Sequence, residues 1–156
     1  MRIGHGYDAH GFISGRPLIL GGVTIPYDKG LKAHSDGDAV IHALCDALLG
    51  SAGLGDIGVY FPDSKEQYKN IDSRILLREV VNIISDKGAR IGNVDITILA
   101  QVPKLSPYLN DMKKILSEDL KTSDDNVNLK VTTTEHMGFV GREEGIAVYS
   151  VVTLIS

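Results

Sequence analysis

An aspartate and a histidine two positions apart, Asp8 and His10, are the residues near the start of the chain best suited to chemistry. If this segment is a strand, residues i and i+2 point to the same face, so both side chains can reach one metal ion. His42 lies off the apolar stripe of a helix predicted further along the chain. These three side chains would form a ligand set with one open tetrahedral position, as in catalytic zinc sites. The spacing alone also fits a solvated aspartate beside a hydrogen-bonded histidine.

Two carboxylates lie one helical turn from His42, Asp38 before it and Asp46 after it. A carboxylate at this distance can hold a metal-binding imidazole in one tautomer. We expect Asp46 rather than Asp38 to take this role.

Three further segments carry groups suited to phosphate. His34 and Ser35 precede a predicted helix whose N-terminus would attract an anion, although Ser35 also fits a turn beside the helix cap. The run from Thr132 to Glu135 offers hydroxyls for phosphate oxygens and a carboxylate for a hard cation, or ends a solvent-facing strand. Arg142 could clamp a phosphate or pair with a neighbouring glutamate. For the run from Thr132 to Glu135, the residues alone favour the solvent-facing strand end. For the other two segments, spacing does not decide between the alternatives.

The elements that must position these residues follow from the apolar periodicity. Alternation predicts strands over 3–10, 94–102, 127–134 and 145–155 with a short hairpin at 18–27, and helical spacing predicts helices over 38–50, 72–87 and from 106 onward. A turn is expected at 28–30. Because strands and helices do not alternate strictly, this order favours an α+β fold, with a mixed four-stranded sheet and helices packed on one face.

Length and composition limit the class of protein. A chain of 156 residues is expected to form a single domain spanning 1–156. The single cysteine, Cys45, excludes a disulfide framework and fits a reducing, cytoplasmic compartment. A net charge of -4 and the lack of a long apolar segment argue against nucleic-acid and membrane partners. The common hydrolase, zincin, NTPase and dinucleotide motifs are absent.

Five separated blocks carry distinctive residues: RIGHGYDAH at 2–10, AHSDGD at 33–38, GDIG at 55–58 with FPD at 61–63, TTTE at 132–135, and GF with GR within 138–142. In this order and spacing they resemble the 2-C-methyl-D-erythritol 2,4-cyclodiphosphate synthase family over essentially the whole chain. The resemblance implies a lyase of non-mevalonate isoprenoid biosynthesis. Its reaction converts 4-diphosphocytidyl-2-C-methyl-D-erythritol 2-phosphate into the cyclic diphosphate and CMP.

The resemblance also implies roles for individual residues. Asp8, His10 and His42 would bind Zn²⁺, and Glu135 would bind Mg²⁺ or Mn²⁺ between the α- and β-phosphates. His34 and Thr133 would stabilise the transition state. The implied substrate-binding residues are Ser35, Asp56, Ile57, Gly58, Phe61, Asp63, Ala100, Lys104, Leu105, Ser106, Thr132, Phe139 and Arg142.

The implied mechanism is an attack by the substrate's own 2-phosphate oxygen on the β-phosphorus, so the protein must fold the substrate rather than activate a nucleophilic side chain. Two other functions fit the same residues. A metal-dependent phosphohydrolase would use the Asp/His/His site to activate water and release a linear product. A binding protein for isoprenoid diphosphates would use the metal for structure alone.

A homotrimer is the expected assembly, because the family shares each active site between neighbouring chains. The closing strand, 146–155, is apolar on both alternating faces, more than a sheet covered on one side requires. Threefold packing would cover the second face and leave an apolar channel ringed by Arg142 and Glu144. In this family such a channel can hold an isoprenoid diphosphate.

Overall fold

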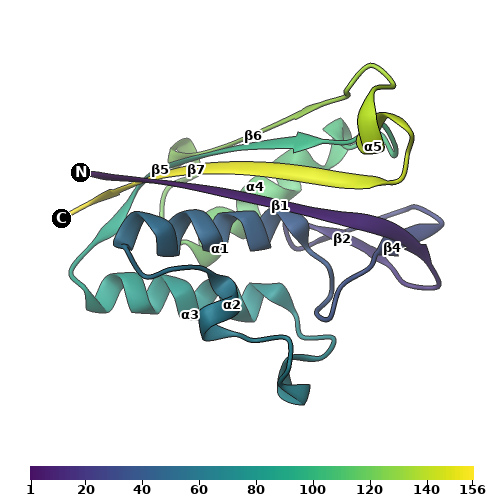
Figure 1. The fold of residues 1–156 in the computed structure, drawn as a ribbon. Coiled ribbons are helices and arrows are strands. Elements are labelled where there is room, and N and C mark those ends of the chain that lie inside the picture. Colours follow the sequence, from purple (N-terminus) through teal and green to yellow (C-terminus); the bar gives the residue numbers. More distant parts are fainter.

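The computed structural model describes residues 1–156 and contains one large sheet with helices on one of its faces (Figure 1). The strands of this sheet are β1 (Arg2–Ser14), β4 (Lys29–Leu31), β5 (Arg90–Leu99), β6 (Val127–Thr132) and β7 (Gly145–Ile155). They lie in the order β4-β1-β7-β5-β6, with β5 and β6 parallel and every other pair antiparallel. Two further strands, β2 (Leu18–Leu20) and β3 (Val23–Ile25), form a separate hairpin.

The helices are α1 (Ala39–Ala52), α2 (Ile57–Tyr60), α3 (Ser73–Asp86), α4 (Leu109–Asp119) and α5 (Gly138–Gly141). Single turns of 3₁₀ helix occur at Glu66–Tyr68, Ser106–Tyr108 and Asp124–Asn126. Helix α1 lies directly against β1 and β7, and α3 packs on α1 away from the sheet (Figure 1). None of these helices is both long and apolar enough to cross a membrane.

The predicted α+β class and mixed sheet are confirmed, but the prediction of four strands is wrong because the sheet has five. Strand β1 runs past its predicted end, and Phe12–Ser14 pairs with Lys29–Leu31, the segment expected to be a turn. Gly30 has a different role from that of a turn glycine. A Cβ at Gly30 would lie 2.4 Å from the carbonyl oxygen of Pro17, so glycine is needed there for close approach.

The contact between α1 and β1 is made backbone to backbone. A Cβ at Gly6 would lie 1.9 Å from the carbonyl oxygen of Ala43, and a Cβ at Gly4 would lie 1.9 Å from that of Ala47. Only glycine at both strand positions allows the helix to lie this close. His42, which precedes Ala43, is thereby held beside the part of β1 that follows Gly6.

Asp38 fastens the β2–β3 hairpin to the start of α1. Its buried carboxylate accepts hydrogen bonds from the backbone N–H groups of Gly21 at 2.9 Å, Gly22 at 2.8 Å and Ile41 at 3.1 Å. Burial and the nearby charge of Asp36 raise the pKa of Asp38 to about 6. Asp38 is therefore the N-cap residue of α1, and its carboxylate is fully occupied by backbone donors.

The face of the sheet opposite the helices is apolar and uncovered in one chain. Ile3 and Tyr7 of β1 and Tyr149 and Val151 of β7 are each more than 40% exposed. The rings of Tyr7 and Tyr149 lie 5.0 Å apart between centroids. The second apolar face predicted for the closing strand is confirmed.

We predict that Gly6→Ala will destabilise the protein, because the added methyl group would meet a backbone carbonyl that no rotamer change can move. The free energy of unfolding should fall by about 3 kcal/mol, measured by denaturant titration. Gly11→Ala is the matched control in the same strand, since its nearest contact would be an ordinary 3.7 Å. Equal stability of the two variants would show that the close approach of α1 is not required.

Candidate active site

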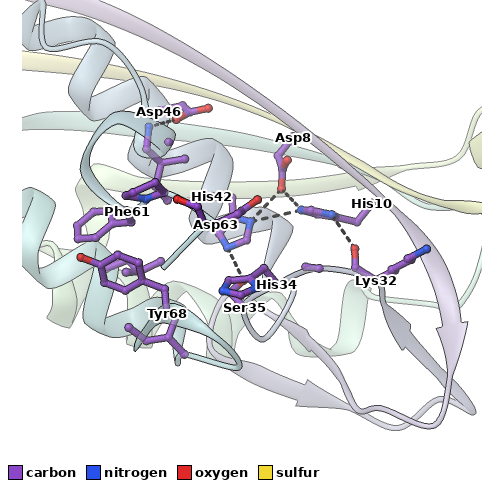
Figure 2. Close-up of a pocket in the computed structure, with 17 residues that line it drawn as sticks. Asp8, His10, Lys32, His34, Ser35, His42, Asp46, Phe61, Asp63 and Tyr68 are labelled. Carbon is purple, nitrogen blue, oxygen red and sulfur yellow. Dashed lines mark hydrogen bonds and ion pairs between the residues drawn. The ribbon is translucent and has the colours of Figure 1, made fainter. Parts of the chain in front are cut away.

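One pocket of about 790 Å³ opens between β1 and the first half of α1. Asp8 and His10 come from β1, and His42 and Asp46 come from α1 (Figure 2). The rest of the wall comes from residues 32–35 between β4 and α1, from the segments around α2 and the first 3₁₀ turn, and from the start of α3. Strand alternation places Asp8 and His10 on one face, while the helix presents His42 from the opposite side. The pocket therefore lies where β1 and α1 approach each other closely.

Asp8, His10 and His42 converge as the sequence predicted (Figure 2). Asp8 Oδ2 lies 2.8 Å from His10 Nε2 and 3.3 Å from His42 Nδ1. The two imidazole nitrogens lie 3.4 Å apart. One carboxylate and two imidazoles are a donor set that suits a divalent transition metal.

The hydrogen bonds around these atoms favour a cation between them. His10 Nδ1 lies 3.0 Å from the carbonyl oxygen of Lys32, which can only accept, so His10 Nδ1 is the donor. A neutral His10 then turns the lone pair of Nε2 toward Asp8 Oδ2. That oxygen is buried and has no hydrogen-bond donor. Two lone pairs at 2.8 Å repel each other unless a proton or a metal ion lies between them, so the residues present fit a metal.

The pKa shifts of Asp8 and His42 also favour a cation at this position. Burial would raise the pKa of Asp8, but its contacts with His10 and His42 outweigh burial and lower the pKa to about 2. Burial would lower the pKa of His42, but its contact with Asp8 and the Asp8 charge outweigh burial and raise the pKa. The pKa shifts of both groups thus show a local environment that favours positive charge beside Asp8, as a bound cation would supply.

The expected carboxylate partner of His42 is not found. Asp46 instead accepts a hydrogen bond from the backbone N–H of Ile57 at 2.8 Å, at the start of α2. The far nitrogen of His42, Nε2, faces two hydroxyls, Ser35 Oγ and Ser73 Oγ, each at 3.0 Å. The prediction for Asp46 is therefore wrong because the start of α2 takes its carboxylate.

Part of the predicted substrate site lines this pocket. Figure 2 shows His34, Ser35, Phe61 and Asp63 beside the three candidate ligands. Ile57 and Gly58 also line it, whereas Asp56 caps α2 by accepting from the N–H of Val59 at 3.2 Å.

Lys32 and Tyr68 are among the pocket residues that were not predicted. Lys32 is the only lysine or arginine of the lining and could attract a phosphate. Lys32 directly precedes the AHSDGD block but belongs to no motif. Its positive charge was therefore the only feature of the sequence that could have indicated a role in the pocket.

The other predicted site residues lie elsewhere in the chain. They follow the C-terminal ends of β5 and β6 or lie near α5, and none lines the pocket: Ala100, Lys104, Leu105, Ser106, Thr132, Thr133, Glu135, Phe139 and Arg142. Ala100 and Leu105 are buried, whereas Thr133 and Glu135 are exposed. The structure of one chain thus places the predicted residues in two separate groups.

The second group has its own local order. Thr133 Oγ1 accepts a hydrogen bond from the backbone N–H of Glu135 at 3.3 Å, which leaves the hydroxyl proton free to donate. Glu135 and His136 both have positive φ angles, 52° and 61°, so the chain turns sharply there. The exposed Arg142 pairs with Glu144, with Nε 3.0 Å from Oε1.

Comparison with known proteins covers the whole chain. Residues 1–155 match the YgbB family. The 2-C-methyl-D-erythritol 2,4-cyclodiphosphate synthase of Pseudomonas putida strain W619 is 59% identical over 155 residues, which cover 99% of each chain. The enzyme of the same name from Azotobacter vinelandii strain DJ is 57% identical over 156 residues, which cover 100% of this chain and 99% of that one.

Solved structures share the fold. A CDP-bound 2C-methyl-D-erythritol-2,4-cyclodiphosphate synthase superposes with a TM-score of 0.90 at 37% identity, over 99% of this chain and 100% of that chain. A CDP complex from Plasmodium falciparum gives 0.87 at 36% identity, over 99% and 95%. The bifunctional IspDF of Campylobacter jejuni gives 0.95 at 45% identity, over 98% of this chain but 42% of that longer chain.

Together with the pocket, these matches define the class of protein as an enzyme, a phosphorus–oxygen lyase. The chain belongs to the YgbB family, the 2-C-methyl-D-erythritol 2,4-cyclodiphosphate synthases of non-mevalonate isoprenoid biosynthesis. The lyase class excludes the phosphohydrolase and the binding-protein alternatives.

We predict that the protein binds a divalent metal ion at Asp8, His10 and His42, and that His42→Ala will not retain it because one of the three convergent ligands is removed. His34→Ala is the matched control. It lines the same pocket, but its Nε2 faces the carbonyl oxygen of Lys65 at 3.2 Å rather than Asp8. Elemental analysis of both purified variants checks this, and full metal content in His42→Ala would contradict the assignment.

Proposed function

We propose that this chain, as one catalytic domain over 1–156, converts 4-diphosphocytidyl-2-C-methyl-D-erythritol 2-phosphate into the 2,4-cyclodiphosphate and CMP. The observation that carries the proposal is the convergence of Asp8 Oδ2, His10 Nε2 and His42 Nδ1 in a family member's pocket. Asp8, His10 and His42 would hold Zn²⁺, and Glu135 would hold Mg²⁺ or Mn²⁺. When bound, these ions supply Lewis acidity at phosphoryl oxygens and offset negative charge.

The pocket residues would bind the 2-phosphate and erythritol end of the substrate. His34 is oriented by the carbonyl oxygen of Lys65, and Ser35 Oγ accepts from the N–H of Gly37 at 3.2 Å. Lys32 adds a positive charge beside them. The polyol would lie against the wall formed by Ile57, Gly58, Phe61 and Asp63, with Asp56 fixing the start of α2.

The chemistry needs positioning more than activation. The substrate's 2-phosphate oxygen forms a bond to the β-phosphorus, while the bond from that phosphorus to the bridging oxygen breaks and CMP leaves. Because both reacting groups belong to one molecule, holding them in line replaces a nucleophilic side chain. His34 in its doubly protonated form, with Nε2–H donated to the carbonyl oxygen of Lys65, would donate Nδ1–H to an oxygen that gains charge. The free hydroxyl proton of Thr133 would make a second such hydrogen bond.

The nucleotide would bind at the second group of residues. Ala100, Lys104, Leu105, Ser106 and Thr132 would surround the cytidine and its diphosphate, with Phe139 and Arg142 beyond them. The CDP-bound relatives support a cytidine diphosphate compound as the substrate. Since these residues do not line the pocket of their own chain, a complete site requires a second chain.

We therefore propose a homotrimer in which the nucleotide residues of one chain face the metal pocket of the next. The uncovered apolar face of β1 and β7, with Ile3 and Tyr149, supports packing around a threefold axis. The channel left on that axis would be ringed by Arg142 and Glu144 and could hold an isoprenoid diphosphate. We further propose a cytoplasmic location, consistent with the free thiol of Cys45.

The proposed reaction is tested by incubating the cytidyl substrate with the protein, Zn²⁺ and Mg²⁺ and following phosphorus-31 NMR. The expected result is the paired signals of a cyclic diphosphate together with CMP. A linear phosphate product, or no turnover in the metal-loaded protein, would contradict the proposal.

We predict that Glu135→Gln will slow cyclisation by about 100-fold or more while the metal at His42 stays bound, because a neutral amide is a poor ligand for a hard cation. Turnover at limiting Mg²⁺, together with zinc content, measures both effects. Glu79→Gln, an exposed glutamate on α3, is the control. Unchanged turnover at limiting Mg²⁺ would show that Glu135 only ends a strand.

We predict that mixing two inactive variants, His42→Ala and Lys104→Ala, will restore part of the activity, because some sites in mixed trimers combine two intact halves. Mixing His42→Ala with Asp8→Ala is the control, since both damage the same half. Light scattering should give three times the 16.8 kDa of one chain. An active monomer, or no recovery in the first mixture, would contradict the shared site.

A further inference from the structure

Ser73, the first residue of α3, is fully buried and contacts the candidate metal ligand His42 from the side away from Asp8. Its hydroxyl oxygen lies 3.0 Å from His42 Nε2. The same hydroxyl lies 2.5 Å from Asp36 Oδ1, and the backbone N–H of Ser73 donates to Asp36 Oδ2 at 3.0 Å. Both oxygens of Asp36 are thus directed at one serine, 37 residues away in the sequence.

These contacts fix the direction of each hydrogen bond. An ionised carboxylate only accepts, so the single hydroxyl proton of Ser73 is donated to Asp36. The Ser73 oxygen then has only lone pairs to offer to His42. The only hydrogen bond that Ser73 can make to His42 is therefore one that it accepts from Nε2–H. The Asp36–Ser73 pair favours the tautomer with the proton on Nε2 and the lone pair on Nδ1, against the attraction of Asp8 for a proton on Nδ1.

We propose that Asp36 and Ser73 are positioning residues that hold His42 in the tautomer able to bind metal through Nδ1. This inference rests on the metal site of the proposed function. Asp36 takes the proton of Ser73, Ser73 accepts from His42, and His42 is left with its metal-facing nitrogen free. Hydroxyls can serve as outer partners of metal-binding histidines in this way when their own proton is committed elsewhere.

Ser35 does not set the tautomer, although its hydroxyl is also 3.0 Å from His42 Nε2. It accepts from the N–H of Gly37 at 3.2 Å, and no carboxylate takes its proton. The Ser35 hydroxyl can therefore donate as well as accept. Because Ser73 already accepts from His42, Ser35 remains free to turn its proton toward a substrate phosphate.

The tautomer is measured directly by nitrogen-15 NMR of the metal-free protein with labelled histidine, at alkaline pH where imidazole is neutral. The His42 signals are identified by their loss in His42→Gln. The expected result is a proton on Nε2 and none on Nδ1. A proton on Nδ1 of wild-type His42 would overturn the proposal without any variant being needed.

Substitutions of Ser73 distinguish a role in positioning His42 from a role in packing alone. Ser73→Ala should give a mixture of tautomers and weaken zinc binding by about 10-fold to 100-fold, while Ser73→Thr, which keeps a hydroxyl, should retain both properties. Ser117→Ala is the matched control, because Ser117 is a buried helix serine whose hydroxyl, like that of Ser73, lies against a carboxylate, Asp124, and does not contact His42. Ser35→Ala should leave the Nε2 proton in place.

The proposal fails if Ser73→Ala and Ser117→Ala have the same tautomer and the same zinc affinity. Its failure is distinguishable from that of the proposed function. Zinc-dependent cyclisation with a wild-type Nδ1 proton in the metal-free state would reject only the positioning role. A fixed Nε2 proton in a protein that produces no cyclic diphosphate would reject only the reaction.

Discussion

The close approach of α1 to β1 is the constraint on which the rest of the structure depends. A Cβ at Gly4 or Gly6 would collide with a backbone carbonyl of the helix, and backbone atoms cannot rotate away as side chains do. Glycine at these two positions therefore lets the strand and the helix lie in close backbone contact. Asp8 and His10 on the strand and His42 on the helix come within contact distance because of this close approach. The ligands lie on a strand and a helix rather than on loops, so their relative positions are well defined.

The electrostatics of the pocket follow from this geometry. Asp8 is a half-buried carboxylate whose buried oxygen, Oδ2, has no hydrogen-bond donor, and two imidazole nitrogens point at it. The arrangement is unfavourable without a proton or a metal ion and favourable with one. In the proposed reaction, a chain with a net charge of -4 would act on an anionic substrate because bound cations and Lys32 would supply positive charge beside the phosphates.

Local patterns in the sequence were sufficient for most elements. For the three candidate ligands, spacing left a solvated aspartate beside a hydrogen-bonded histidine open, and the family resemblance favoured the metal site. The closing strand β7 has the predicted bounds, because strong alternation and a flanking glycine mark both the face and the start of the strand. Features set by distant contacts were not predictable. Gly30 joined a strand rather than a turn because of Pro17, and Ser73 reaches His42 from 31 residues away. The hydrogen bond from the backbone N–H of Ile57 to Asp46 likewise could not be predicted from helical spacing.

X-ray absorption at the zinc edge of the purified protein tests the central claim most directly, because it reports which atoms surround the metal. The structure predicts two imidazole nitrogens at about 2.0–2.1 Å and at least one oxygen at about 2.0–2.2 Å, with no sulfur. A shell of six oxygens, or a sulfur ligand from the buried Cys45, would contradict the assignment of Asp8, His10 and His42 as the metal centre.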